Sequence, residues 1–173
     1  MEHWEGKACL DAVSVSDLHT FDNDISVWQV NNLAELDMVG LAIAMTRTKL
    51  KDFYVVILNA EEISALGLQV KDQMGESRYN EVNEFHKNIY IPTIWEMGYL
   101  SKYVYKQLHN KNNVHYFAES ELRQILYKTV KEQRMDVSFM KDKDGQYLRK
   151  SLLTACIENK DKVLNQQIQG LAQ

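Results

Sequence analysis

Two carboxylates, Asp22 and Asp24, precede a strand-like run at residues 25–30 (ISVWQV). Acids in this position could converge on a divalent metal ion, as in nucleases that carry carboxylates before a crossover helix. Such a site also needs a further carboxylate and a lysine on the next strand, and residues 25–30 supply neither. The sequence therefore favours a plain turn without tight metal binding. A hydrolase-like or nuclease-like enzyme with a degenerate carboxylate site is the alternative.

Asparagines follow the two clearest strand-like runs of the chain. Asn32 is followed three residues later by Glu35, and Asn59 is followed three residues later by Glu62. This is the spacing of a capping box, in which the first side chain accepts a hydrogen bond from the third helical amide and the glutamate reaches back. The sequence therefore predicts that each asparagine begins a helix.

The same strand ends could instead form a ligand site. In an open parallel sheet, ligands bind beyond the carboxyl ends of the strands, where four polar side chains would gather. These side chains are Asn31, Asn32, Asn59 and Glu61. The glycine-rich phosphate-binding fingerprints are absent, because no glycine lies between Gly6 and Gly40. Capping is the favoured interpretation, and a ligand at this edge stays open.

The helix expected after the only proline carries the most unusual pattern in the chain. Trp95, Tyr99 and Tyr103 recur every four residues and form a stripe, which Lys102 and Lys106 border. Large aromatic side chains flanked by charge are enriched in partner-binding surfaces. These five residues are therefore the predicted partner-binding site.

The same aromatic stripe could be a second packing layer beneath the C-terminal helices. The core face predicted for this helix consists of Ile94, Met97, Leu100, Val104 and Leu108, with Gly98 permitting a close approach. Because the stripe lies beside that face, we expect Trp95 to be at least partly buried. Tyr99 and Tyr103 would then be the contact residues.

Hydrophobic spacing predicts the elements that must hold these residues. Residues 25–30 and 53–58 read as strands, and apolar positions three or four apart predict a helix over residues 33–48. The nearly continuous apolar run at 53–58 is typical of an inner parallel strand, so this helix would be a right-handed crossover. The remaining expected elements are a polar loop over residues 69–80, a helix over 92–110, a strand over 114–117, a helix over 119–134 and mostly helix from 147.

These elements predict an α/β fold with a small mixed, partly parallel sheet packed by several helices and a helix-rich C-terminal half. The chain of 173 residues is expected to form a single domain over residues 1–173. A soft division at about residues 69–80 is the alternative. It would separate an acidic half from a more basic one, because residues 1–75 carry 12 acidic and 5 basic side chains and residues 76–173 carry 12 and 15.

Composition narrows the class of protein. Hydrophobic residues are 45% and charged residues 25% of the chain, which is ordinary for a soluble globular protein. The apolar runs are too short to span a bilayer, and the N-terminus lacks the pattern of a signal peptide. Cys9 and Cys156 stand in no motif, which fits a reducing, cytoplasmic location.

The sequence therefore predicts a cytoplasmic protein-interaction protein without catalysis, such as an inhibitor, an immunity protein or an accessory protein. Its partner would be another protein, whose identity the sequence does not give. A homodimeric structural protein that uses the aromatic stripe on itself is the second alternative. We expect no cofactor, no metal ion and no membrane. Nucleic acid is disfavoured because the most basic segment, residues 123–150, carries 8 basic and 4 acidic residues that are interleaved.

Overall fold

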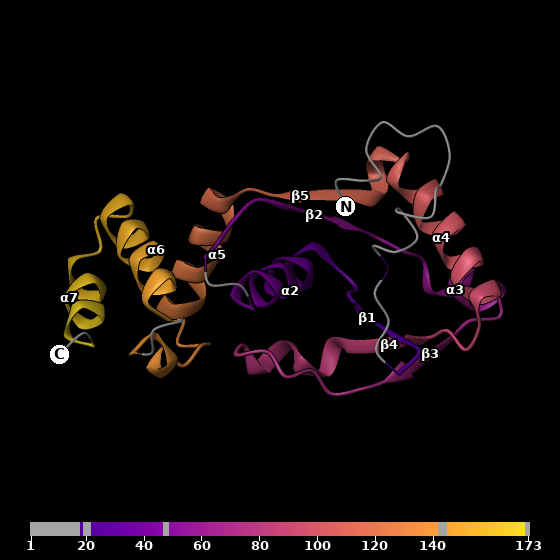
Figure 1. The fold of residues 1–173 in the computed structure, drawn as a ribbon. Helices are drawn as coiled ribbons and strands as arrows, with labels where there is room; N and C mark the ends of the chain where they lie inside the picture. The colour runs from indigo at the N-terminus through magenta and orange to yellow at the C-terminus, as the bar shows by residue number, and fades with distance from the viewer. Residues whose placement is uncertain (1–17, 19–21, 47–48, 142–144, 172–173) are drawn as a thin grey trace. The chain divides into compact units, whose positions relative to one another are not determined.

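The computed structural model describes residues 18, 22–46, 49–141 and 145–171 (Figure 1). The described residues divide into two compact units, each built from separate stretches of chain. The first unit comprises the residues up to Gln29 together with Tyr54–Met74 and His86–Tyr116, and the second comprises Val30–Phe53, Gly75–Phe85 and the residues from Phe117 on. The prediction of one domain over residues 1–173 stays a prediction.

The sheet of the first unit contains three antiparallel strands in the order β1-β4-β3. These are β1 (Asp24–Trp28), β4 (His86–Tyr90) and β3 (Gln69–Asp72). The central strand β4 pairs with β1 in the register that places Ser26 opposite Asn88. The turn predicted before β1 is present, since Asp22 and Asn23 adopt the left-handed backbone conformation with φ of 51° and 65°.

A second, two-stranded sheet is formed by β2 (Phe53–Val56) and β5 (Val114–Phe117). It is antiparallel, because the end of β2 lies beside the start of β5. There the amide of Ile57 donates to the carbonyl of Asn113 at 2.7 Å. Tyr54 and Tyr116 of these strands stack with ring centroids 4.8 Å apart. The fold is therefore helix-rich α/β with two small antiparallel sheets.

The predicted parallel sheet is wrong. The helix predicted over residues 33–48 is present as Leu33–Met45, but it does not connect two parallel strands of one sheet. β1 and β2 belong to different sheets and do not pair with each other. The apolar run of β2 suggested an inner strand covered on both faces, but its Tyr54 side chain is 60% exposed. The predicted loop over residues 69–80 is also partly wrong, because its first four residues form β3. All four are exposed, so this edge strand carries no hydrophobic signal.

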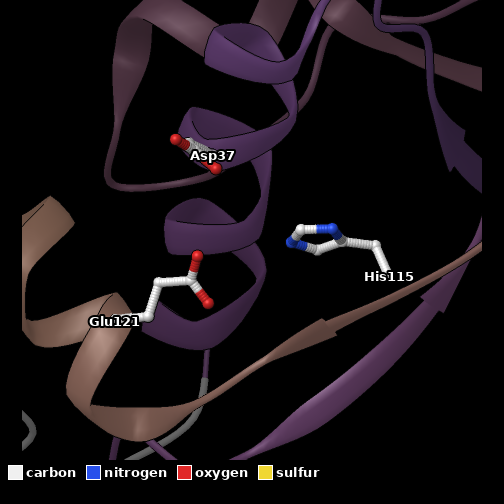
Figure 2. Close-up of side chains that lie close together, drawn as sticks. All are labelled: Asp37, His115 and Glu121. Carbon is white, nitrogen blue, oxygen red and sulfur yellow. The ribbon is translucent and has the colours of Figure 1, made fainter.

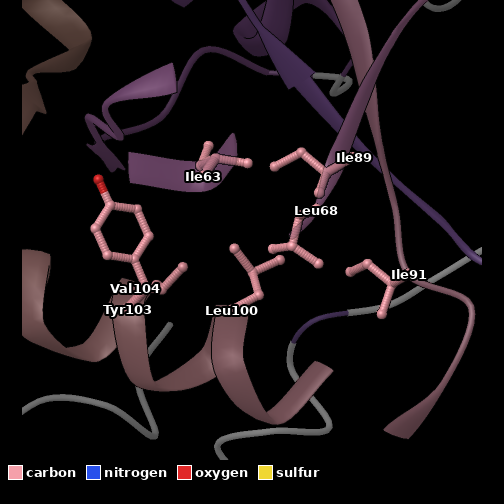
Figure 3. Packing of buried hydrophobic residues seen from close by; sticks show 7 residues of the cluster. All are labelled: Ile63, Leu68, Ile89, Ile91, Leu100, Tyr103 and Val104. Atoms are coloured by element: carbon pink, nitrogen blue, oxygen red, sulfur yellow. The ribbon is translucent and has the colours of Figure 1, made fainter. Parts of the chain in front are cut away.

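The core of the first unit lies between one face of the three-stranded sheet and two helices, α3 (Ala60–Ala65) and α4 (Ile94–Leu108). Figure 3 shows its buried side chains, which come from α3, the residue before β3, β4 and the residue after it, and α4. They are Ile63, Leu68, Ile89, Ile91, Leu100, Tyr103 and Val104. Ile25 and Val27 of β1 pack against this cluster. The short 3₁₀ helix η2 (Lys111–Asn113) follows α4.

The second unit is helical. It contains α2 (Leu33–Met45), η1 (Asn80–Phe85), α5 (Glu119–Lys131), η3 (Ser138–Lys141), α6 (Gly145–Glu158) and α7 (Lys162–Gly170). Helix α2 packs on α5, α5 packs on α6, and α6 packs on α7. The predicted amphipathic helix over residues 119–134 is confirmed as α5, which buries Leu122, Leu126 and Val130. Among the residues that the structure describes, no helix combines the length and apolarity needed to span a membrane.

Both predicted helix caps are confirmed. The Asn32 side chain accepts from the Glu35 amide at 2.9 Å, and the Asn59 side chain accepts from the Glu62 amide at 3.0 Å. In the first cap the Glu35 carboxylate reaches one residue further back than expected, because it accepts from the amide of Asn31 at 2.7 Å. The local spacing of these residues therefore explains their presence, as in other side-chain caps.

Candidate interaction surface on α4

Local hydrogen bonds fix the beginning of α4. Thr93 is the N-cap, and its hydroxyl oxygen accepts from the Trp95 amide at 3.2 Å. The same hydroxyl donates to the carboxylate of Glu96, and this bond holds the pKa of Glu96 below its usual value. Thr93 and Glu96 together therefore cap the first turn of the helix, which begins two residues after Pro92.

One side of α4 packs into the core of the first unit. Its buried residues are Leu100, Ser101, Tyr103, Val104 and Gln107. An α-helix turns by about 100° per residue, so the residues opposite this side share a single outer arc. Six exposed residues of α4 lie on that arc: Ile94, Trp95, Gly98, Tyr99, Lys102 and Lys106. We call these six residues the α4 outer face.

Three large apolar side chains of the α4 outer face are exposed to solvent. The exposed fractions are 72% for Ile94, 73% for Trp95 and 54% for Tyr99. The expectation that Trp95 is at least partly buried is therefore wrong, as is the assignment of Ile94 to the core. The core face is centred on Leu100 and Val104, and Ile94 lies too far around the helix to reach it.

Tyr103 differs from its two companions in the predicted stripe. Residues four apart advance by about 40° beyond a full turn, so a stripe with this spacing winds around the helix. It passes from Trp95 on the outer face to Tyr103 in the core, where the ring is 8% exposed (Figure 3). The Tyr103 hydroxyl accepts from the Asn59 amide at 2.9 Å, and burial raises the pKa of this phenol.

The bond between Tyr103 and Asn59 changes the second helix cap. Tyr103 occupies the Asn59 amide, so Glu62 does not complete a capping box there and instead accepts from Gln107 at 3.4 Å. Gln107 in turn accepts from the side-chain amide of Asn113. These bonds tie the start of α3 to the second half of α4.

A polar depression of about 420 Å³ lies beside these bonds. Its lining comes from the end of β2, from α3, from α4 and from η2. The lining residues are Ile57, Leu58, Asn59, Glu62, Tyr103, Lys106, Gln107, Asn110 and Asn113. Two predicted site residues, Tyr103 and Lys106, therefore border this depression, whereas Trp95 and Tyr99 lie nearer the start of the helix and do not line it.

Gly98 lies between the exposed apolar residues of the α4 outer face. The sequence suggested that it permits a close approach, but no described atom lies within 4 Å of the position that a Cβ would occupy. Glycine inside a helix costs about 1 kcal/mol relative to alanine. No packing contact within the described residues offsets this cost.

The charges on the α4 outer face are positive. Lys102 and Lys106 are both exposed, and the acidic Glu96 lies around the helix from them, engaged with Thr93. The face therefore combines an apolar area at the start of the helix with a basic border toward its end. The sequence identified the aromatic and basic members but assigned Ile94 and Gly98 to the core. A helical wheel centred on Leu100 and Val104 would have placed both on the outside.

Other candidate residues do not form a comparable surface. Figure 2 shows the carboxylates of Asp37 on α2 and Glu121 on α5, together with His115 on β5. His115 belongs to the first unit and the two carboxylates belong to the second, so we do not treat the three as one site. Two carboxylates alone are too few ligands for a specific metal centre.

The two sheets do not bring the predicted strand-end residues together at one edge. Since β1 and β2 lie in different sheets, their ends do not form one sheet edge. Asp22 lies in the turn, and Asp24 accepts from Asn88 at 3.3 Å and lies 3.8 Å from the ammonium group of Lys71. Asp24 is thereby engaged within the three-stranded sheet.

No protein family model, no curated protein and no solved structure matches this chain.

Proposed function

We propose that this chain is a protein-interaction protein that binds a partner protein through the α4 outer face. The observation that carries the proposal is the exposure of Ile94, Trp95 and Tyr99 on one helix, around a glycine that no atom of the described residues approaches. Single exposed apolar residues are common, but a contiguous group that includes Trp and Tyr is typical of binding surfaces. An inhibitor, immunity or accessory role would use such a surface without catalysis.

The residue types of the α4 outer face indicate what kind of contact it would make. Trp95 and Tyr99 can bury large rings at small cost in side-chain entropy, since each has only two rotatable side-chain bonds. Gly98 leaves room for a side chain or backbone segment of the partner. Lys102 and Lys106 lie at the rim of the face, where charges affect the rate of association more than the affinity.

Affinity capture with single substitutions tests the proposal. Wild-type chain, Trp95→Ala, Tyr99→Ala and the control Ile157→Ala would be immobilised, and bound proteins would be identified by mass spectrometry. Ile157 is a suitable control because it is 69% exposed but lies on α6 of the second unit. We expect a specific protein on wild type and Ile157→Ala that Trp95→Ala loses, with binding weakened by about 2 kcal/mol or more. Retention of every captured protein by Trp95→Ala would contradict the proposal.

A further inference from the structure

We propose that the partner of the α4 outer face is a second copy of this chain, bound with its α4 antiparallel across a two-fold axis. This inference rests on the proposed function and names the occupant of the same surface. A two-fold interface is self-complementary, so the surface must contain both the projecting groups and the gaps that receive them. The α4 outer face contains both within two turns of one helix.

Four residues of the face form two matched pairs, each with members four residues apart. Trp95 and Tyr99 lie along one edge of the outer arc, and Ile94 and Gly98 lie along the other. A two-fold axis perpendicular to the helix brings the same edge of each copy together with the chain direction reversed. An axis level with the midpoint between Glu96 and Met97 therefore brings Trp95 to within about 1.5 Å of the level of the partner's Tyr99, and Ile94 to within about 1.5 Å of the level of the partner's Gly98. Each contact occurs twice.

The sizes of the paired groups fit this arrangement. Ile94 projects from the helix with 72% of its surface exposed, and the position above Gly98 has no described atom within 4 Å. A side chain that projects into the space left by a glycine lets two helices approach closely. Trp95 and Tyr99 form an aromatic pair on the other edge, where offset or edge-to-face contacts are favourable.

The charges of the face distinguish the antiparallel arrangement from a parallel one. With the axis midway between Glu96 and Met97, the two copies of Lys102 are separated by about 16.5 Å along the helix, because each residue rises about 1.5 Å. That distance exceeds the screening length of about 8 Å at physiological ionic strength, so repulsion is weak. A parallel pair would place Lys102 beside Lys102 and Lys106 beside Lys106. Like charges therefore oppose the parallel arrangement.

Sedimentation equilibrium on the full chain, combined with a size exchange, tests the pairing of Ile94 with Gly98. Gly98→Leu fills the gap and should weaken self-association at least about thirtyfold, because both copies of the contact then clash. Ile94→Ala removes the projecting group and should weaken it as well. In an equimolar mixture of the two variants, the heterodimer has one native contact and one in which leucine faces alanine. We expect the mixture to associate more tightly than either variant alone.

Three outcomes overturn the inference: a wild-type chain that stays monomeric up to about 1 mM, a Gly98→Leu variant that associates like wild type, or a mixture no tighter than its components. Failure of the inference is distinguishable from failure of the proposed function. A monomeric chain that still binds a different protein through Trp95 would leave the proposed function standing and remove only the second copy as the partner. Circular dichroism and thermal melting of each variant check that it is folded.

Discussion

Gly40 of α2 and Gly98 of α4 both lie inside a helix, but their surroundings are opposite. A Cβ on Gly40 would lie 2.3 Å from the tip of the Phe117 ring, so the second unit uses this glycine to bring a helix against an aromatic side chain. A Cβ on Gly98 would meet no described atom within 4 Å. Among the described residues, a glycine thus has an internal packing reason in the second unit, whereas Gly98 in the first unit has none.

The two units also differ in whether the selected side chains bond to other residues of the chain or face solvent. In the second unit, Asp161 accepts from the hydroxyl of Tyr127 at 3.0 Å and from the Leu164 amide at 3.1 Å, and pairs with Lys131 at 3.1 Å. In the first unit, Trp95 and Tyr99 project outward from a well-capped helix. Folding therefore accounts for the first group of residues, whereas the proposed binding role would account for Trp95 and Tyr99.

The largest effect expected is that of Gly40→Ala. The added methyl group overlaps the Phe117 ring, and overpacking of this kind destabilises by about 2 to 3 kcal/mol after the ring has shifted. Urea unfolding monitored by circular dichroism measures the loss. A variant as stable as wild type would show that Phe117 moves freely, and the packing contrast with Gly98 would then disappear.

Tyr103→Phe should have the next largest effect. It removes the hydroxyl that accepts from the Asn59 amide at 2.9 Å, and leaves that part-buried donor unsatisfied. We expect a loss of about 1.5 kcal/mol in the free energy of unfolding. Because Tyr103 is anchored internally and Tyr99 is not, Tyr99→Phe is the matched control and should leave stability unchanged within about 0.5 kcal/mol. Equal losses for the two variants would refute the distinction between them.

Asn32→Ala and Asn59→Ala should each reduce stability by about 1 kcal/mol, because each removes a helix cap. Thermal melts measured beside a binding assay give both readouts. A variant that loses binding while its melting temperature is unchanged would mean that the asparagine belongs to a site rather than to a cap.

Caps and the amphipathic α5 were predictable because they depend on residues three or four apart. Strand pairing was not, because β1 finds β4 more than 50 residues away and that choice leaves no local pattern. The polar strand β3 was missed for the same reason. On α4 the residue types of the candidate surface were predictable, but the rotation of the helix was not, and it exchanged the expected positions of Ile94 and Tyr103.

Gly98→Ala should stabilise the monomer slightly. Alanine is favoured over glycine in a helix by about 0.5 to 1 kcal/mol, and here the added methyl group meets no described atom. Chemical unfolding at a low protein concentration, where association does not contribute, measures the gain. A destabilised Gly98→Ala variant would indicate that part of the chain already packs against this position, and the gap would then not be available to a partner.

The stability of Trp95→Ala tests most directly whether the α4 outer face is a binding surface and not a packing layer. The side chain is 73% exposed, so the free energy of unfolding of the monomer should change by no more than about 0.5 kcal/mol, while binding or self-association is weakened. Urea titration of wild type and Trp95→Ala at the same low concentration gives this value. A loss of about 3 to 5 kcal/mol, the cost of deleting a buried aromatic side chain, would show that Trp95 belongs to the core and would contradict the account.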